Sequence, residues 1–256
     1  MTSEGRVKAS RQAKFRQVNR FLELVDDCVE SLPEEGDLQV VDFGCGKSYL
    51  TFALHHLLTQ LRDRTVRIVG IEREAEVVAD CRRVAQQLGL DTIEFHQGDI
   101  SGYSHEGRVD LAVSLHACDT ATDDALARAV KWQAAVILAV PCCQHEFAGD
   151  LVIEDLAAVH RHGILHDRLA ALVTDAVRAE ALEVCGYRTR VVEFIDMEHT
   201  AKNVLLRAVR REPGEVDARR RRERSETYRG LRRMLGIEMT RLEEQLGSEL
   251  VERVAD

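Results

Sequence analysis

Apolar residues near the start of the chain recur at three- and four-residue steps, which is the spacing of one face of an amphipathic helix. The repeat begins at Phe15 and continues to Leu32, just before Pro33. Short apolar runs and longer amphipathic stretches then alternate. We predict strands over residues 38–44, 66–72, 92–96, 109–115 and 134–140, and helices over residues 48–61, 74–88 and 120–131. This alternation is a βαβ series.

These strands are apolar on both faces, which is typical of a parallel sheet covered by helices on both sides. After a helix over residues 165–185, two more strands are predicted over 190–196 and 203–209. The link of six residues between them is too short for a parallel crossover. We therefore predict an α/β fold, with a Rossmann-like, doubly wound, mostly parallel seven-stranded sheet and an antiparallel last strand.

The chain divides into three parts: an N-terminal amphipathic helix (1–34), the α/β domain (35–211) and a charged helical C-terminal extension (212–256). Helices are predicted in the extension over residues 215–233 and 237–254.

Charge is distributed unevenly along the chain, whose net charge is −9. Residues 1–20 carry +5 and residues 207–241 carry +6, which leaves −20 for the remainder. Basic termini on an acidic body can mark a surface that faces nucleic acid. The alternative for the Arg-rich helix is a solvated helix with many internal ion pairs.

Some classes of protein are excluded by composition. The longest apolar run has ten residues, whereas a membrane-spanning helix needs about 20. The first thirty residues lack the apolar stretch of a secretory signal. The number of cysteines, seven, is odd and fits reduced thiols. We expect a cytoplasmic protein with no membrane contact.

Polar or glycine-rich clusters directly follow the predicted strands, at residues 44–49, 72, 98–101, 114–119, 141–146 and 196–203. In an open α/β sheet, ligands bind beyond the carboxyl ends of the strands, so these clusters are expected to converge. The first cluster, DFGCGKSY, is not a Walker A loop, because Val41 occupies the place of its first glycine. It also lacks the third glycine of a dinucleotide fingerprint, since that position is Tyr49.

The charge of Asp42 narrows the choice of ligand. A carboxylate beside the glycine loop would repel a pyrophosphate but would attract an ammonium group. Glu72, at the end of the second strand, is placed to accept hydrogen bonds from a ribose diol. Together these residues indicate an adenosine that carries an amine, and S-adenosylmethionine fits that description.

With these motifs, residues 38–210 resemble class I S-adenosylmethionine-dependent methyltransferases. The resemblance implies that Asp42, Gly44 and Gly46 hold the methionine part of the cofactor and that Glu72 holds the ribose. It further implies that Asp99 and Ile100 contact the adenine, although Asp99 could instead be a helix cap or turn residue. Tyr49 and Ser114, which adjoin the first and fourth strands, are also assigned to the cofactor pocket.

Three further strings, SLHACDTATDDAL (114–126), VPCCQHE (140–146) and EHTAKNVLLRAV (198–209), carry a narrower resemblance. They resemble a bacterial branch of the DFGCGKSYL type. This branch is related to the methyltransferase-like domain of the glutathione S-transferase C-terminal-domain-containing protein. It is also related to tRNA acceptor-stem 2′-O-methyltransferases.

Candidate catalytic residues lie in the loops after the fourth and fifth strands, which we expect to be neighbours. They are His116, Asp119, Cys142, Cys143 and His145. A histidine could act as an acid or base, or a cysteine thiolate could add to a pyrimidine ring before methylation at ring carbon five. Thiolate and imidazole groups could also bind zinc, but no set has zinc-finger spacing, so we assign no metal. The alternative to all three is that these side chains pack and shape the pocket.

The sequence thus predicts a methyltransferase whose cofactor is S-adenosylmethionine and whose favoured substrate class is RNA, possibly tRNA, bound through the basic termini. A non-catalytic RNA-binding or scaffold protein with a relic cofactor pocket is the main alternative. A NAD-dependent oxidoreductase is disfavoured by Tyr49 and Asp42.

Overall fold

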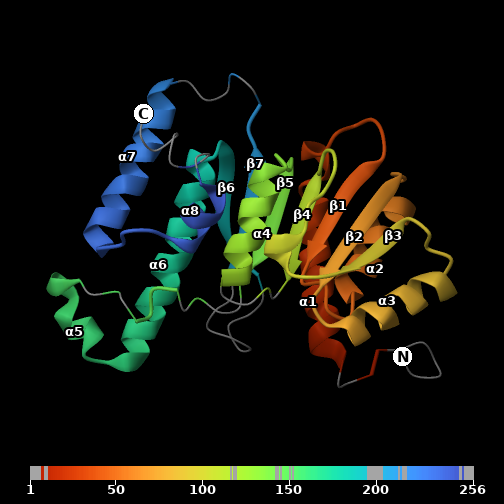
Figure 1. Cartoon of the computed structure of the whole chain (residues 1–256), viewed down its shortest axis with the longest axis horizontal. Coiled ribbons are helices and arrows are strands. Elements are labelled where there is room, and N and C mark those ends of the chain that lie inside the picture. Colours follow the sequence, from red (N-terminus) through yellow and green to blue (C-terminus); the bar gives the residue numbers. More distant parts are fainter. Residues whose placement is uncertain are drawn as a thin grey trace.

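The centre of the molecule is one seven-stranded sheet with the order β3-β2-β1-β4-β5-β7-β6 (Figure 1). The structure is a computed structural model that describes residues 7–8, 11–115, 117, 120–141, 144, 146–149, 151, 153–194, 204–212, 214, 218–247 and 250. The strands are β1 (Leu38–Phe43), β2 (Val66–Glu72), β3 (Ile93–Gln97), β4 (Leu111–Leu115), β5 (Val136–Val140), β6 (Tyr187–Glu193) and β7 (Val204–Arg210).

The pairing of the strands confirms the predicted topology. β1 pairs in parallel with β2 and β4, and β4 pairs in parallel with β5. β7 is antiparallel to both of its neighbours, β5 and β6. The chain moves outward from β1 to β3 and then returns to place β4 on the other side of β1. The strand order therefore reverses between β1 and β4, and such folds bind ligands beyond the carboxyl ends of the strands at this point.

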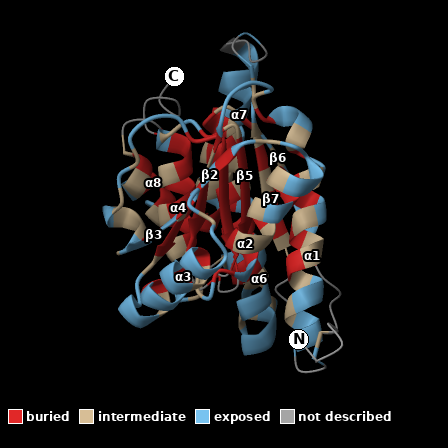
Figure 2. Cartoon of the chain, turned by 90° about the vertical axis from the view of Figure 1, so that its right-hand side faces the viewer, coloured by how far each residue is buried: buried red, intermediate tan, exposed pale blue. Residues whose placement is uncertain are grey.

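The central strands form because their side chains are buried on both faces. Every residue of β4 and of β5 is buried. Both runs, LAVSL and VILAV, are almost wholly apolar, so burial on either face is favourable. Figure 2 shows the buried strands of the sheet, β5 among them, between helices whose outward faces are exposed.

Helices cover the two faces of the sheet in separate groups. They are α1 (Gln12–Asp26), α2 (Tyr49–His56), α3 (Ala75–Gln87), α4 (Thr120–Lys131), α5 (Ala157–His160), α6 (Gly163–Val184), α7 (Ala218–Leu235) and α8 (Arg241–Leu246). The first three contribute to one hydrophobic core, through residues such as Phe21, Leu54 and Val78. α4, α6, α7 and α8 contribute to the other core. In the part of the chain that the structure describes, no helix is long and apolar enough to cross a membrane.

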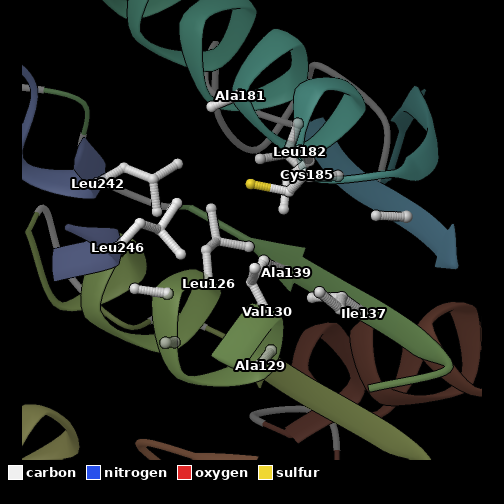
Figure 3. Close-up of a cluster of buried hydrophobic side chains, with 14 of the residues drawn as sticks. Leu126, Ala129, Val130, Ile137, Ala139, Ala181, Leu182, Cys185, Leu242 and Leu246 are labelled. Carbon is white, nitrogen blue, oxygen red and sulfur yellow. The ribbon is translucent and has the colours of Figure 1, made fainter. Parts of the chain in front are cut away.

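The C-terminal helix α8 is part of this second core. Leu242 and Leu246 are buried and lie with Leu126 of α4 and Leu182 of α6 in one cluster (Figure 3). The start of α8 is fixed by Thr240, whose hydroxyl accepts a hydrogen bond from the backbone N–H of Glu243 while the Glu243 side chain accepts one from the backbone N–H of Thr240. The C-terminal extension therefore completes the hydrophobic core.

The bounds of several elements differ from those predicted, and three of these differences have a clear physical reason. The first helix ends at Asp26, and a separate 3₁₀ turn, Val29–Ser31, carries the chain on to buried Leu32. Strand β6 begins at Tyr187, three residues before the predicted strand, because its inner face starts with that buried tyrosine. The last helix begins at Arg241 instead of residue 237, because the Thr240 cap sets its start.

Candidate functional site

The loop after β1 is bent by three residues with positive φ. Gly44 has φ 66°, Gly46 has φ 53° and Ser48 has φ 57°. Such angles are strained for serine, so its surroundings must hold it there. The Ser48 side chain is fully buried and its hydroxyl lies 3.1 Å from the sulfur of Cys81 in α3. The loop is thus a fixed bend that leads directly into the N-terminus of α2.

Open space lies beside this bend. Among the described residues, a Cβ atom built on Gly46 would meet no atom within 4 Å, whereas one built on Gly44 would lie 3.9 Å from Cβ of Ala117 in the loop after β4. The backbone at Gly46 is therefore accessible to a ligand from the side that a side chain would fill.

Asp42, next to the end of β1, is 1% exposed. Its Oδ2 atom accepts a hydrogen bond of 2.6 Å from the Thr51 hydroxyl in α2. Burial raises the pKa of this carboxyl group to about 7, although the Thr51 hydrogen bond and the nearby Lys14 both lower it. Near neutral pH the group is divided between its two protonation states, and a cationic ligand would favour the ionised one.

Glu72, the last residue of β2, is joined to the same loop. Its Oε2 atom accepts a hydrogen bond of 3.0 Å from the backbone N–H of Gly46. Its Oε1 atom accepts hydrogen bonds from the backbone N–H groups of Arg73 and Glu74, at 2.8 and 3.1 Å. A carboxylate can accept about four hydrogen bonds, so acceptor capacity remains for a ligand hydroxyl. Both predicted acids therefore lie close to this glycine bend, Asp42 just before it in β1 and Glu72 in contact with Gly46.

The two residues expected near an adenine follow β3. Asp99 is exposed, and it precedes the 3₁₀ turn Ile100–Gly102 without a side-chain hydrogen bond to that turn. Its carboxylate is not used as a cap there. Ile100 is half-buried and packs against the core.

Ser114 lies at the centre of the ligand edge of the sheet, beside Phe43 of β1 and Ala139 of β5. It is 3% exposed, and its hydroxyl has no hydrogen-bond partner in the described part of the chain. An unpaired buried hydroxyl costs about 1–3 kcal/mol. The unpaired Ser114 hydroxyl would suit a polar ligand that supplies the missing hydrogen bond.

The side chain of Tyr49, which was also assigned to the cofactor pocket, contacts the N-terminal segment of the chain. It is 45% exposed, and its hydroxyl accepts a hydrogen bond of 3.0 Å from Nη1 of Arg11, just before α1. The first residue of α2 thereby connects the glycine loop to the N-terminal helix.

The five candidate catalytic residues, His116, Asp119, Cys142, Cys143 and His145, lie outside the described residues. Their roles stay predictions. The strands that lead into their loops, β4 and β5, are neighbours as predicted. Between these candidates, Ala117 is buried and its carbonyl accepts a 2.7 Å hydrogen bond from the Thr122 hydroxyl of α4.

A buried ion network near these loops was not predicted from the sequence. Arg178 of α6 donates two hydrogen bonds to Asp123 of α4, at 2.8 and 2.6 Å, and its Nη1 atom lies 3.6 Å from Asp175. Asp175 accepts a hydrogen bond of 3.0 Å from Gln144, in the loop after β5. Burial raises the pKa of Asp175 to about 6, against the attraction of Arg178. The sequence does contain one sign of this network: Asp175 and Arg178 are oppositely charged and lie three residues apart on the apolar face of a helix.

Comparisons with known proteins agree with this geometry. Residues 13–150, more than half of the chain, match the sequence model of a family described as "Methyltransferase domain". The chain is 31% identical over 132 residues to the glutathione S-transferase C-terminal domain-containing protein homolog of Drosophila pseudoobscura pseudoobscura, which is 52% of this chain and 21% of that protein. It is 25% identical over 229 residues to the human glutathione S-transferase C-terminal domain-containing protein, and this match covers 79% of this chain and 34% of the human protein.

A third relative is the 23S rRNA (uracil(1939)-C(5))-methyltransferase RlmD of Methylococcus capsulatus, with 28% identity over 155 residues, 58% of this chain and 32% of that one. The chain thus spans 21–34% of the length of these relatives. Among solved structures, magnesium protoporphyrin IX methyltransferase from Synechocystis PCC 6803 aligns over 81% of this chain and 89% of its own, with a TM-score of 0.49 and 14% identity. The family match over residues 13–150 shows that this chain belongs to the methyltransferase-domain family, of the class I, S-adenosylmethionine-dependent type.

Proposed function

We propose that this protein transfers a methyl group from S-adenosylmethionine to RNA. The observation that carries the proposal is the arrangement of Asp42 and Glu72 around the Gly46 bend, with the unpaired hydroxyl of Ser114 at the end of β4. This edge of the sheet offers two acids, an accessible backbone and a free hydroxyl to one ligand.

The residues present fit this cofactor. Asp42 would attract the methionine ammonium, Glu72 would accept hydrogen bonds from the ribose hydroxyls, and Asp99 would accept one from the adenine amine. A dinucleotide fits less well, because a pyrophosphate at the Gly46 bend would lie near two carboxylates. When bound, S-adenosylmethionine supplies an electrophilic methyl group.

The contribution of the chain itself is to position the reactants and to exclude water. The loops after β4 and β5 adjoin the cofactor edge, so an acceptor bound between them would meet the methyl group. His116 and His145 are the candidates for moving an acceptor proton. Cys142 and Cys143 are the alternative candidates, as nucleophiles toward a pyrimidine ring. The uracil C5 position named for the Methylococcus relative is the acceptor that this second mechanism would use.

RNA is proposed from charge and from that relative. Exposed Lys8, Arg11 and Arg16 lie at the N-terminal end of α1, on the side of the molecule that carries the glycine loop. The Arg-rich helix α7 is a weaker candidate. Its Arg224 lies 3.5 Å from Glu183, and its Arg232 lies 2.5 Å from Glu243, so these charges are paired with the protein's own acids. We therefore propose that RNA approaches along α1.

The test is to incubate the purified protein with methyl-labelled S-adenosylmethionine and fractionated extract from a strain that lacks the gene. We expect label in RNA that ribonuclease releases and protease does not, and no label with the Glu72→Gln variant. Label only in protein or in a small metabolite would overturn the RNA assignment. RNA binding that is insensitive to the cofactor, without methyl transfer to any fraction, would favour the non-catalytic alternative.

A further inference from the structure

A cavity of about 480 Å³ lies between the N-terminal helix α1 and the start of α2. Its walls include the cations Lys8, Arg11 and Lys14, together with Tyr49. Tyr49 is the first residue of α2 and directly follows the glycine loop, so this cavity adjoins the predicted methionine end of the cofactor site. Phe15 and Val18 of α1 and Ala53 of α2 form much of the remaining wall.

Lys14 differs from the other two cations. Lys8 and Arg11 are exposed, whereas Lys14 is half-buried and its ammonium donates a hydrogen bond of 2.9 Å to Oε1 of Gln17, one turn along α1. Burial lowers the pKa of Lys14, and the attraction of Asp42 raises it. Lys14 in turn lowers the pKa of Asp42. The two groups therefore lie within electrostatic reach of each other, one from α1 and the other from β1.

The methionine end of the cofactor is a zwitterion, with an ammonium and a carboxylate on one carbon atom. Asp42 suits the ammonium, but it would repel the carboxylate, as would Glu72. A cation on the other side of the same carbon atom would stabilise that carboxylate. Among the described residues, Lys14 is the cation whose charge acts on Asp42.

We propose that Lys14 binds the α-carboxylate of the cofactor, so that α1 forms one wall of the cofactor pocket. Gln17 holds the ammonium in place through its hydrogen bond. This inference depends on S-adenosylmethionine being the cofactor, but it does not depend on the identity of the methyl acceptor.

The test compares two ligands that differ only in the carboxylate: S-adenosylhomocysteine and its decarboxylated analogue, S-adenosyl-3-thiopropylamine. Calorimetry would measure both with the full chain and with the Lys14→Met variant. Methionine keeps the helix propensity of lysine and removes the charge. We expect the variant to bind S-adenosylhomocysteine about 10- to 100-fold more weakly, which is the range for a charged hydrogen bond. Its affinity for the decarboxylated analogue should fall much less, because only the effect of Lys14 on the ionisation of Asp42 is lost there.

Arg16→Met is the matched control, because Arg16 is an exposed cation on the same helix and does not line the cavity. It should leave both affinities unchanged, and Lys14→Arg should restore most of the affinity for S-adenosylhomocysteine. Equal weakening of both ligands by Lys14→Met, or no weakening of either, would overturn the proposal. Failure of the wild-type protein to bind either ligand would instead refute the cofactor assignment.

Discussion

Replacing Arg178 with methionine is expected to destabilise the protein strongly. Arg178, Asp123 and Asp175 are 1%, 0% and 7% exposed, so loss of the guanidinium leaves two carboxyl groups in the interior without their cation. Breaking a buried pair in this way costs about 3–5 kcal/mol. Total unfolding free energies are about 5–15 kcal/mol, so this is a large share.

Urea unfolding followed by circular dichroism measures the effect. With a slope of about 3 kcal/mol per molar urea, the midpoint should fall by about 1–2 M. The deficit should also depend on pH. The attraction of Arg178 is one of the causes that lower the pKa of Asp175, so its removal raises a pKa that burial has already raised to about 6. A carboxyl group whose pKa is raised by folding loses stability as pH increases through the folded value, so the deficit should be smaller at pH 5 than at pH 8.

The matched variant Arg178→Met with Asp123→Leu removes both members of the closest pair. It should recover most of the lost stability, because replacing a whole buried ion pair with apolar groups is often close to neutral. A loss below about 1 kcal/mol in the single variant would refute the account of a tightly coupled network. So would a deficit that is equal at pH 5 and pH 8.

The other predictions concern the cofactor edge and the sheet beneath it. Because burial sets the pKa of Asp42 at about 7, affinity for S-adenosylhomocysteine should rise about tenfold from pH 6 to pH 8, and calorimetry should find no such rise in Asp42→Asn. That variant should also be more stable than wild type at pH 8 in thermal unfolding, since it removes a buried charge; lower stability would contradict this. Gly46→Ala should weaken the same binding at least tenfold, because it puts a Cβ atom into the open space; unchanged affinity would exclude a ligand there. It should also lower the free energy of unfolding by about 1–3 kcal/mol, because alanine is strained at φ 53°. Gly70→Ala should lower Tm by about 3–10 °C, because its Cβ would lie 2.7 Å from the Phe95 ring; an unchanged Tm would mean that the ring can move away freely.

Much of the fold could be predicted because the sheet is buried on both faces. The runs that form β4 and β5 are apolar throughout, and a buried parallel strand leaves that pattern. The edge strand β6 is mostly exposed, so its pattern is weak, and the apolar pair Val191 and Val192 drew the prediction three residues too far along. The Thr240 and Glu243 spacing is a capping-box signal that the apolar line of the last helix obscured.

Some residues of the candidate site could also be predicted from the sequence, and others could not. Asp42, Gly46 and Glu72 each lie at or just beyond the carboxyl end of a strand, so topology alone brings them together at one edge of the sheet. Arg178 and Lys14 come from helices far away in the sequence, and their importance depends on which carboxylates they meet in the folded chain. Local periodicity carries no information about the pairing of Arg178 with Asp123 or of Lys14 with Asp42.

Titration of S-adenosylhomocysteine into the purified protein, with Glu72→Gln alongside and NAD as the competing ligand, tests the central claim most directly. We expect saturable one-to-one binding to the wild-type protein, at least about tenfold weaker binding to the variant, and no binding of NAD. Absence of saturable binding, equal affinity of the two proteins, or tight binding of NAD would contradict the assignment of this edge of the sheet to S-adenosylmethionine.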